Sequence, residues 1–162
     1  MRKVRYISLA CLLCLLFCSC AAENYTDTLS CKEVANALVR EILPQKEYKN
    51  YSENEILFLI DEKVSFDDCC FLYSSSSDDM SEVAVFHSSE PEVLFDELSK
   101  YTDTLRQEKR SFVENYVPSE LSKLDDGQAR RFGNYVVLAI LEKSERDAIF
   151  EEAKEILSTT GS

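Results

Sequence analysis

Tryptophan is absent from the 162-residue sequence, and glycine and proline occur only three times each. This scarcity of glycine and proline argues against a long flexible linker that would divide the chain into domains. Basic residues are also few: 18 lysines and arginines stand against 30 aspartates and glutamates, for a net charge of −12. Because such a surface repels phosphate backbones, nucleic-acid binding is not expected.

Histidine, the commonest general base, occurs once, as His87. Serine and cysteine hydrolases need a base beside the nucleophile, and His87 ends a predicted strand, where a surface hydrogen bond is its expected role. The sequence has no GxSxG, HExxH, P-loop or dinucleotide-binding motif. The sequence therefore predicts no cofactor and no catalytic residue.

Cysteine is concentrated at the N-terminus, and only Cys31, Cys69 and Cys70 lie beyond residue 20. Three cysteines cannot all pair, so they do not describe a disulfide framework. They include no C-x-x-C pair, and we predict no metal site. The expected role of the three is as small buried residues, with a vicinal or Cys31-linked disulfide as the alternative.

The N-terminus has the pattern of an export signal. Three basic residues precede residues 6–17, an almost unbroken apolar run. Basic residues followed by a short apolar run are typical of a secretory signal peptide. A spanning helix takes about 20 apolar residues, so this run is too short for an ordinary membrane anchor.

The residues after this run resemble a bacterial lipoprotein signal, in which Cys20 would be the lipid-modified residue. Ser19 is a suitable small residue before the cut, although the two residues before it depart from the usual aliphatic and small choices. The alternative is ordinary cleavage after Ala21 or Ala22, which would release the protein. We predict lipidation of Cys20, which would hold the protein through its lipid on the extracellular face of the cell membrane.

These patterns divide the chain into a signal peptide at 1–19, a short tether at 20–28 and a single domain at 29–162. Helical periodicity begins after Ser30, which has capping-box spacing with Glu33. Further helices are expected from Pro91 to residue 117 and from Ser144 onward. Residues 53–62 fit a short helix or a buried strand equally well.

Two hairpins are predicted between these helices. Residues 69–73 and 82–87 flank a serine- and aspartate-rich loop, and residues 128–132 and 135–141 flank Gly133-Asn134. The second hairpin ends in an uninterrupted apolar run, which indicates a strand covered on both faces or by a dimer partner. The predicted fold is α+β: an antiparallel sheet of about four strands, packed with a long central helix and with N- and C-terminal helices.

Residues 81–153 resemble a domain of unknown function found in small lipoproteins of anaerobic Gram-positive bacteria. The resemblance implies an envelope location and an α+β fold, and it implies no activity. The matching features are the strand at 82–86, Arg106 and Gln107, Phe112, Tyr116 with Pro118 and Glu120, and the segment 133–136.

Positive charge in the middle of the long predicted helix suggests the best site that the sequence offers. We predict a docking site for a small anion or a peptide near Arg106, Tyr116 and Tyr135, with helical ion pairing as the alternative role of the arginine. The protein is thus expected to be a non-enzymatic binding or assembly module for an envelope protein or peptide. The alternative function is an envelope hydrolase that uses paired carboxylates such as Asp67-Asp68, Asp78-Asp79 or Asp125-Asp126.

Overall fold

The computed structural model of the chain describes residues 24–61 and 64–158. These residues form a sheet with helices on both faces. The helices are α2 (Cys31–Ile42), α3 (Glu53–Leu59), α4 (Pro91–Tyr116), the 3-10 turn η1 (Pro118–Glu120), α5 (Leu121–Asp126) and α6 (Lys143–Leu157). The strands are β1 (Tyr48–Asn50), β2 (Asp68–Ser74), β3 (Glu82–His87), β4 (Gln128–Phe132) and β5 (Tyr135–Ile140).

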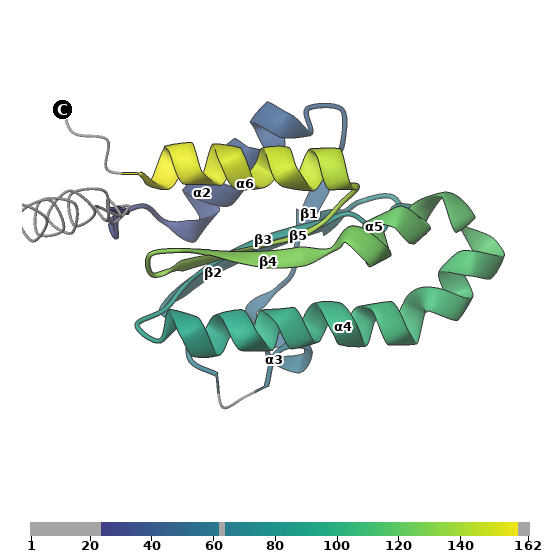
Figure 1. Cartoon of the computed structure of the whole chain (residues 1–162), viewed down its shortest axis with the longest axis horizontal. Helices are drawn as coiled ribbons and strands as arrows, with labels where there is room; N and C mark the ends of the chain where they lie inside the picture. The colour runs from purple at the N-terminus through teal and green to yellow at the C-terminus, as the bar shows by residue number, and fades with distance from the viewer. Residues whose placement is uncertain (1–23, 62–63, 159–162) are drawn as a thin grey trace, which may run out of the picture.

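The sheet lies between two helical layers (Figure 1). Helices α2 and α6 cover one face, and α3 and α4 lie against the other. All strand pairs are antiparallel, in the order β1-β2-β3-β5-β4. The predicted α+β class, both hairpins and the long helix are therefore confirmed.

The sheet has five strands, one more than predicted. The additional strand, β1, pairs with β2 through Tyr48, Lys49 and Asn50. A segment of three residues, two of them polar, is too short to show the alternation of apolar and polar residues that predicts a strand. Its extended conformation depends on pairing with the edge of β2. At the other hairpin the turn prediction holds, because Gly133 adopts a positive φ of 61°.

Local signals explain where the helices begin. The capping boxes of α2 and α3 are both formed, between Ser30 and Glu33 and between Ser52 and Glu55. The second of these boxes selects the helical alternative for the segment at 53–62. Pro91 occupies the first turn of α4, where its missing N–H costs no hydrogen bond.

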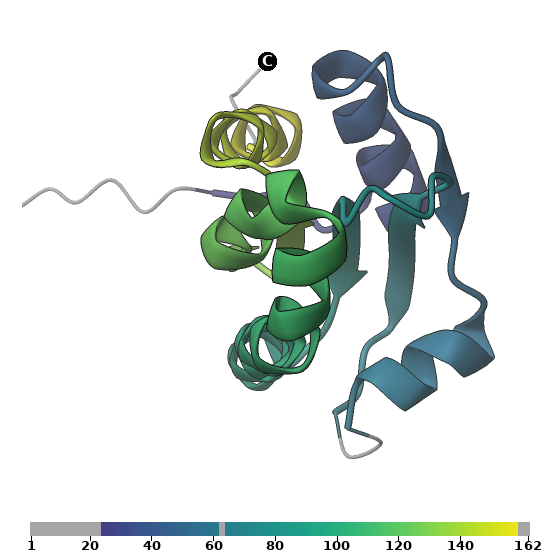
Figure 2. The same cartoon turned by 90° about the vertical axis from the view of Figure 1, so that its right-hand side faces the viewer.

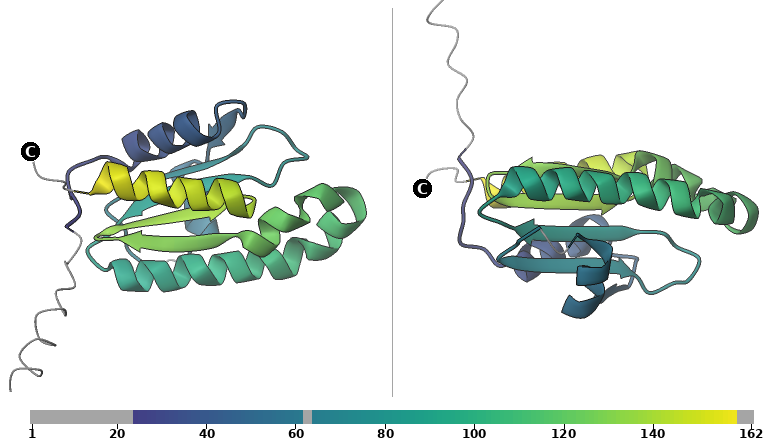
Figure 3. Two further views of the ribbon diagram at one scale, coloured as in Figure 1. Left: turned by 45° about the horizontal axis from the view of Figure 1, so that its top comes forward. Right: turned by 90° about the horizontal axis from the view of Figure 1, so that it is seen from below.

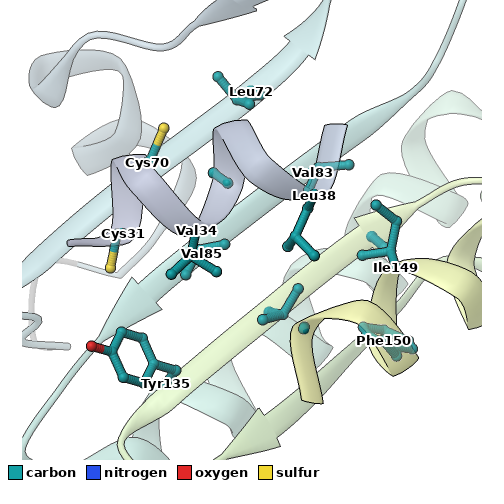
Figure 4. Close-up of a cluster of buried hydrophobic side chains, with 14 of the residues drawn as sticks. Cys31, Val34, Leu38, Cys70, Leu72, Val83, Val85, Tyr135, Ile149 and Phe150 are labelled. Atoms are coloured by element: carbon teal, nitrogen blue, oxygen red, sulfur yellow. The ribbon is translucent and has the colours of Figure 1, made fainter. Parts of the chain in front are cut away.

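Strand β5 is buried along its whole length, and helices of the same chain cover both of its faces. Every second residue of the strand, including Val137 and Ala139, faces α2 and α6. The residues between them, including Val136 and Leu138, face α4. Figure 4 shows the first of these cores, with α2 side chains directed at β2, β3 and β5.

Residues 25–28, which fall within the predicted tether at 20–28, pack on the domain. Tyr25 bridges to Ser158, and its ring meets Phe132 edge-on with centroids 5.8 Å apart. The backbone N–H of Thr26 donates to the carbonyl of Leu157 at 2.8 Å. We call residues 25–28 the N-terminal strap, and Figure 2 shows the described start of the chain beside the end of α6.

Candidate functional site

A groove of about 890 Å³ lies on the α3 and α4 face of the described surface. Helix α4 packs mainly against β4 and β5, whereas α3 lies toward the other edge of the sheet, as the view from below shows (Figure 3). The groove occupies the space that these two helices leave open, and the β2–β3 loop closes one end. Its lining residues are Tyr51, Phe58, Leu59, Tyr73, residues 74–77, Asp79, Met80, Ser81, Glu82, Tyr101, Thr104, Leu105, Glu108, Lys109 and Phe112.

A buried carboxylate forms the polar part of the groove floor. Glu82 is the first residue of β3, and its side chain shares the α4 face with Ala84 and Phe86, two and four residues further along the strand. Glu82 is only 8% exposed. The hydroxyl of Tyr101 donates to one of its carboxylate oxygens at 2.8 Å, and that of Tyr51 donates to the other at 3.3 Å.

Burial raises the pKa of the Glu82 carboxyl to about 7, against the hydrogen bonds from Tyr101 and Tyr51, which favour the ionised form. The more distant charge of Lys109 also acts to lower this pKa. Burial likewise raises the pKa of Tyr101, so its hydroxyl keeps the proton that it donates. The groove therefore contains an acid that changes charge near neutral pH.

Aromatic rings surround this carboxylate. Tyr73 lies opposite Glu82 in the β2–β3 register, so both side chains emerge on the same face of the sheet. The rings of Tyr51 and Tyr73 have centroids 4.3 Å apart at an interplanar angle of 30°. Phe71 meets both Tyr51 and Tyr101 edge-on, at 5.0 and 5.9 Å. These contacts position the two tyrosine hydroxyls on the acid.

Exposed aromatic residues flank the mouth of the groove on two elements. Phe58 of α3 is 90% exposed, and Phe112 of α4 is 50% exposed. The Phe112 ring lies 5.1 Å from that of Tyr116, which is itself 74% exposed. Exposed rings grouped around a hollow are typical of binding surfaces, where they are later covered.

A polar cluster fixes the loop that closes the groove. Lys123 of α5 is buried and donates to Asp79 at 2.8 Å and to Glu120. Burial alone would lower the pKa of Lys123 and raise that of Asp79, but their hydrogen bond and opposite charges outweigh burial and shift both the other way. Glu120 also accepts from the backbone N–H of Met80, at 3.0 Å. The loop is thereby tied to η1 and α5.

Arg106 of α4 binds backbone carbonyls at the end of α5. Its guanidinium donates to the carbonyl oxygens of Leu124, Asp125 and Gly127 at 3.1, 3.4 and 3.4 Å. It also pairs with Asp103 at 2.7 Å. These carbonyls end α5, so Arg106 supplies the donors that a helix C-terminus lacks.

The other two residues of the predicted site lie elsewhere. Tyr135 is fully buried in the core under α2, and its hydroxyl donates to the carbonyl of Leu29 at 2.6 Å. Figure 4 shows its ring among the side chains of that core. Tyr116 is exposed beside Phe112, on α4. The structure does not bring Arg106, Tyr116 and Tyr135 together, because Tyr135 belongs to the opposite face of the sheet from α4. Cys20 lies outside the described residues, and its lipidation remains a prediction.

The carboxylate pairs take part in local contacts. Asp67 lies 3.4 Å from Nδ1 of His87, and Asp68 accepts from the backbone N–H of Cys31 at 2.7 Å. Asp125 pairs with Arg110 at 2.7 Å.

Cys31, Cys69 and Cys70 are free thiols, and burial raises the pKa of each. These thiols are therefore poor nucleophiles.

Sequence reasoning missed Glu82 and Tyr51 as site residues. The available signal was weak: one acidic residue begins a strand that is otherwise apolar up to His87. The hydrophobic stripe of the long helix did include Tyr101, whose polar hydroxyl needs a partner when it is buried. What brings the three residues together is the pairing of β1, β2 and β3, which no local pattern specifies.

Residues 24–61 and 64–158 contain no cluster of three or more histidine, cysteine or acidic side chains placed to hold a metal ion. Within the same residues, no helix has both the length and the apolar character needed to cross a membrane. Comparisons with protein-family models, curated proteins and solved structures find no match to the chain. The resemblance to a lipoprotein domain of unknown function therefore remains a prediction from the sequence.

Proposed function

We propose that this protein is exported, held by a lipid on Cys20 at the extracellular face of the cell membrane, and serves as a binding or assembly module. Its partner is an envelope protein or peptide that occupies the groove between α3 and α4. The support for the location is the order of basic residues, apolar run and Ser19-Cys20. The support for binding is the groove.

The single observation that carries the binding proposal is the position of Phe58 and Phe112. These two residues are on different helices, and both line the same hollow while remaining largely exposed. Covering exposed rings with a partner removes apolar surface from water, which is worth about 25 cal/mol for each Å². Rings that remain uncovered in the folded chain provide this free energy to a ligand instead of to folding.

The location is tested by intact mass measurement on the membrane fraction of a bacterial host, with wild type compared with Cys20→Ala. A lipid-modified mass that begins at Cys20 and is lost in the variant supports the anchor. An unmodified chain in the medium, beginning at Ala22 or Glu23, overturns it. Cys31→Ala is the matched control, because it removes a cysteine that lies beyond the signal.

The binding part is tested with Phe58→Ser and Phe112→Ser, which remove the exposed rings without opening the core. Both variants should fold with wild-type stability while losing retention of envelope peptides on the immobilised protein. Val93→Ser is the control, since Val93 is as exposed as Phe112 but does not line the groove. Retention that is unchanged in both groove variants overturns the proposal.

The groove also supports the second candidate function, an envelope hydrolase. Glu82 and Glu108 both line it, and a carboxyl with a pKa of about 7 can act as a general acid at neutral pH. A hydrolase of this kind would lose activity on glycan or peptide substrates in both Glu82→Gln and Glu108→Gln. Activity that survives both substitutions would exclude the two-carboxylate mechanism.

A further inference from the structure

We propose that the groove recognises a ligand that presents an ammonium group on an apolar stem, with the ammonium placed against Glu82 and the stem between Phe58 and Phe112. This inference rests on the proposed binding function and names the chemical class of its ligand. The partners of Glu82, the rings around it and the charges of the lining support it.

Glu82 has no cationic partner among the described residues. Buried carboxylates in proteins are normally paired with a positive charge or kept neutral. In the described part of the chain no lysine, arginine or histidine forms an ion pair with Glu82, and its hydrogen-bond donors are the neutral hydroxyls of Tyr51 and Tyr101. A carboxylate accepts more than two hydrogen bonds, so acceptor capacity remains for a ligand.

Aromatic rings beside Glu82 also favour an ammonium group. Tyr51, Tyr73 and Tyr101 all line the groove beside the carboxylate. An ammonium group is attracted to the faces of aromatic rings, and cages of such rings are a common way to bind it. The outer pair, Phe58 and Phe112, offers apolar surface to a stem that enters from the mouth.

The charges of the lining are complementary to an ammonium group. The lining contains the acidic residues Asp79, Glu82 and Glu108 and only one basic residue, Lys109. Asp79 already pairs with Lys123, so the other charged residues of the lining are the acidic Glu82 and Glu108 and the basic Lys109. The chain as a whole carries a charge of −12. The electrostatic field of the acidic chain and the charges that line the groove therefore both favour a cation over an anion.

The groups that face Glu82 determine how this binding depends on pH. Tyr51 follows β1, Tyr73 is on β2, and Tyr101 and Lys109 are on α4, while β5 offers the apolar Ile140. Burial raises the pKa of Tyr51 and of Tyr101, so both hydroxyls keep their protons near pH 7, whereas the pKa of Glu82 lies at about 7. Ammonium binding should therefore strengthen as the pH rises through neutrality.

The absence of tryptophan allows a clean measurement. Phe58→Trp places a single indole at the mouth of the groove, and its fluorescence reports occupancy. The probes are n-hexylammonium, 1-hexanol and hexanoate, which share the stem and differ in charge. Calorimetry on the wild-type chain checks that the indole does not create the binding.

At pH 8 we expect hexylammonium to bind at least tenfold more tightly than hexanol, and hexanoate to bind more weakly than either. Glu82→Gln should abolish the preference for the ammonium, and Tyr101→Phe should reduce it several-fold. Asp96→Asn is the matched control, which removes an equal charge from an exposed position of α4 outside the groove and should change binding less than threefold. Lys109→Gln should strengthen hexylammonium binding about twofold to fivefold.

Each other outcome has a defined meaning. Equal binding of the three probes, or a preference for hexanoate that Lys109→Gln removes, overturns the ammonium proposal and leaves the groove as a binding site. A preference for hexylammonium that Glu82→Gln does not change also overturns it. If no probe binds to the wild-type chain, the ammonium proposal is overturned, whereas the proposed binding function is decided separately by the retention of envelope peptides.

Discussion

Nε2 of His87 lies 2.9 Å from Oδ1 of Asp27, so the end of β3 is joined to a residue 60 positions earlier in the chain. Oδ2 of the same carboxylate accepts from the side-chain amide of Asn134 at 2.8 Å. The hydrogen bond with His87 is the largest cause of a lowered pKa for Asp27. One carboxylate thus holds the N-terminal strap against both hairpins of the sheet.

Loss of this carboxylate should loosen the strap without unfolding the domain. For Asp27→Asn we expect the amide of Thr26, which donates to Leu157, to exchange with solvent about threefold to tenfold faster. Hydrogen exchange followed by mass spectrometry measures this. Asp96→Asn is the control, because it removes an equal charge from an exposed position of α4, away from the strap. Unchanged exchange in Asp27→Asn would show that Tyr25 alone docks the strap.

Glu82 should lower stability as the pH rises. Its pKa in the fold is about 7, above the ordinary value of 4.5, so the folded chain keeps a proton that the unfolded chain has released between these pH values. Stability is lost across this window as the pH increases. Urea denaturation should find Glu82→Gln more stable than wild type by about 1–3 kcal/mol at pH 8, with little difference at pH 4. Glu108→Gln, at the exposed wall, should show no such dependence.

Lys123, a buried residue of α5 that pairs with Asp79 of the β2–β3 loop, should be sensitive to substitution. Lys123→Met leaves Asp79 and Glu120 without their cation, and we expect a loss of about 2–4 kcal/mol in the free energy of unfolding. Adding Asp79→Asn to the same chain should recover part of it. Lys100→Met, which breaks an exposed pair with Glu97, is the control. Equal stability of the two lysine variants would contradict the assigned role.

Arg106→Met tests whether this arginine stabilises the fold or binds a ligand. Its donors serve three backbone carbonyls at the C-terminal end of α5, so thermal or urea denaturation should show a loss of about 1–3 kcal/mol. Arg110→Met, which removes a more exposed guanidinium one turn further along α4, should cost much less. Hexylammonium binding should be unchanged in both. A stable Arg106→Met chain with weakened binding would return Arg106 to the candidate site.

Much of this fold could be predicted from the sequence because the chain carries strong local signals. Capping boxes, Pro91 and the Gly133-Asn134 turn act within a few residues, and the apolar run of β5 requires cover on both faces. Strand β1 could not be predicted, because its partner on β2 dictates its conformation. The choice of helix over strand for α3 was visible only in the Ser52 and Glu55 cap.

The candidate site was less predictable than the fold. Arg106 stood out as positive charge in an acidic chain, yet its hydrogen bonds are to backbone carbonyls rather than to a groove. Tyr135 stood out for its position after the turn, yet the strand period directs it to the face under α2. Glu82 is one of many acidic residues in the sequence. What distinguishes it is burial under α4, which depends on contacts distant in sequence.

Strand β3 separates the strap from the groove. His87, which holds the strap, ends β3, whereas Glu82 begins it. With a rise of roughly 3.3 Å per residue, the two sites stand about 17 Å apart along the strand. For a chain tethered through Cys20, this polarity sets the docked end nearest the lipid and directs the groove loop outward. The length of the sheet would then separate the groove from the lipid headgroups of the membrane and leave it accessible to envelope partners.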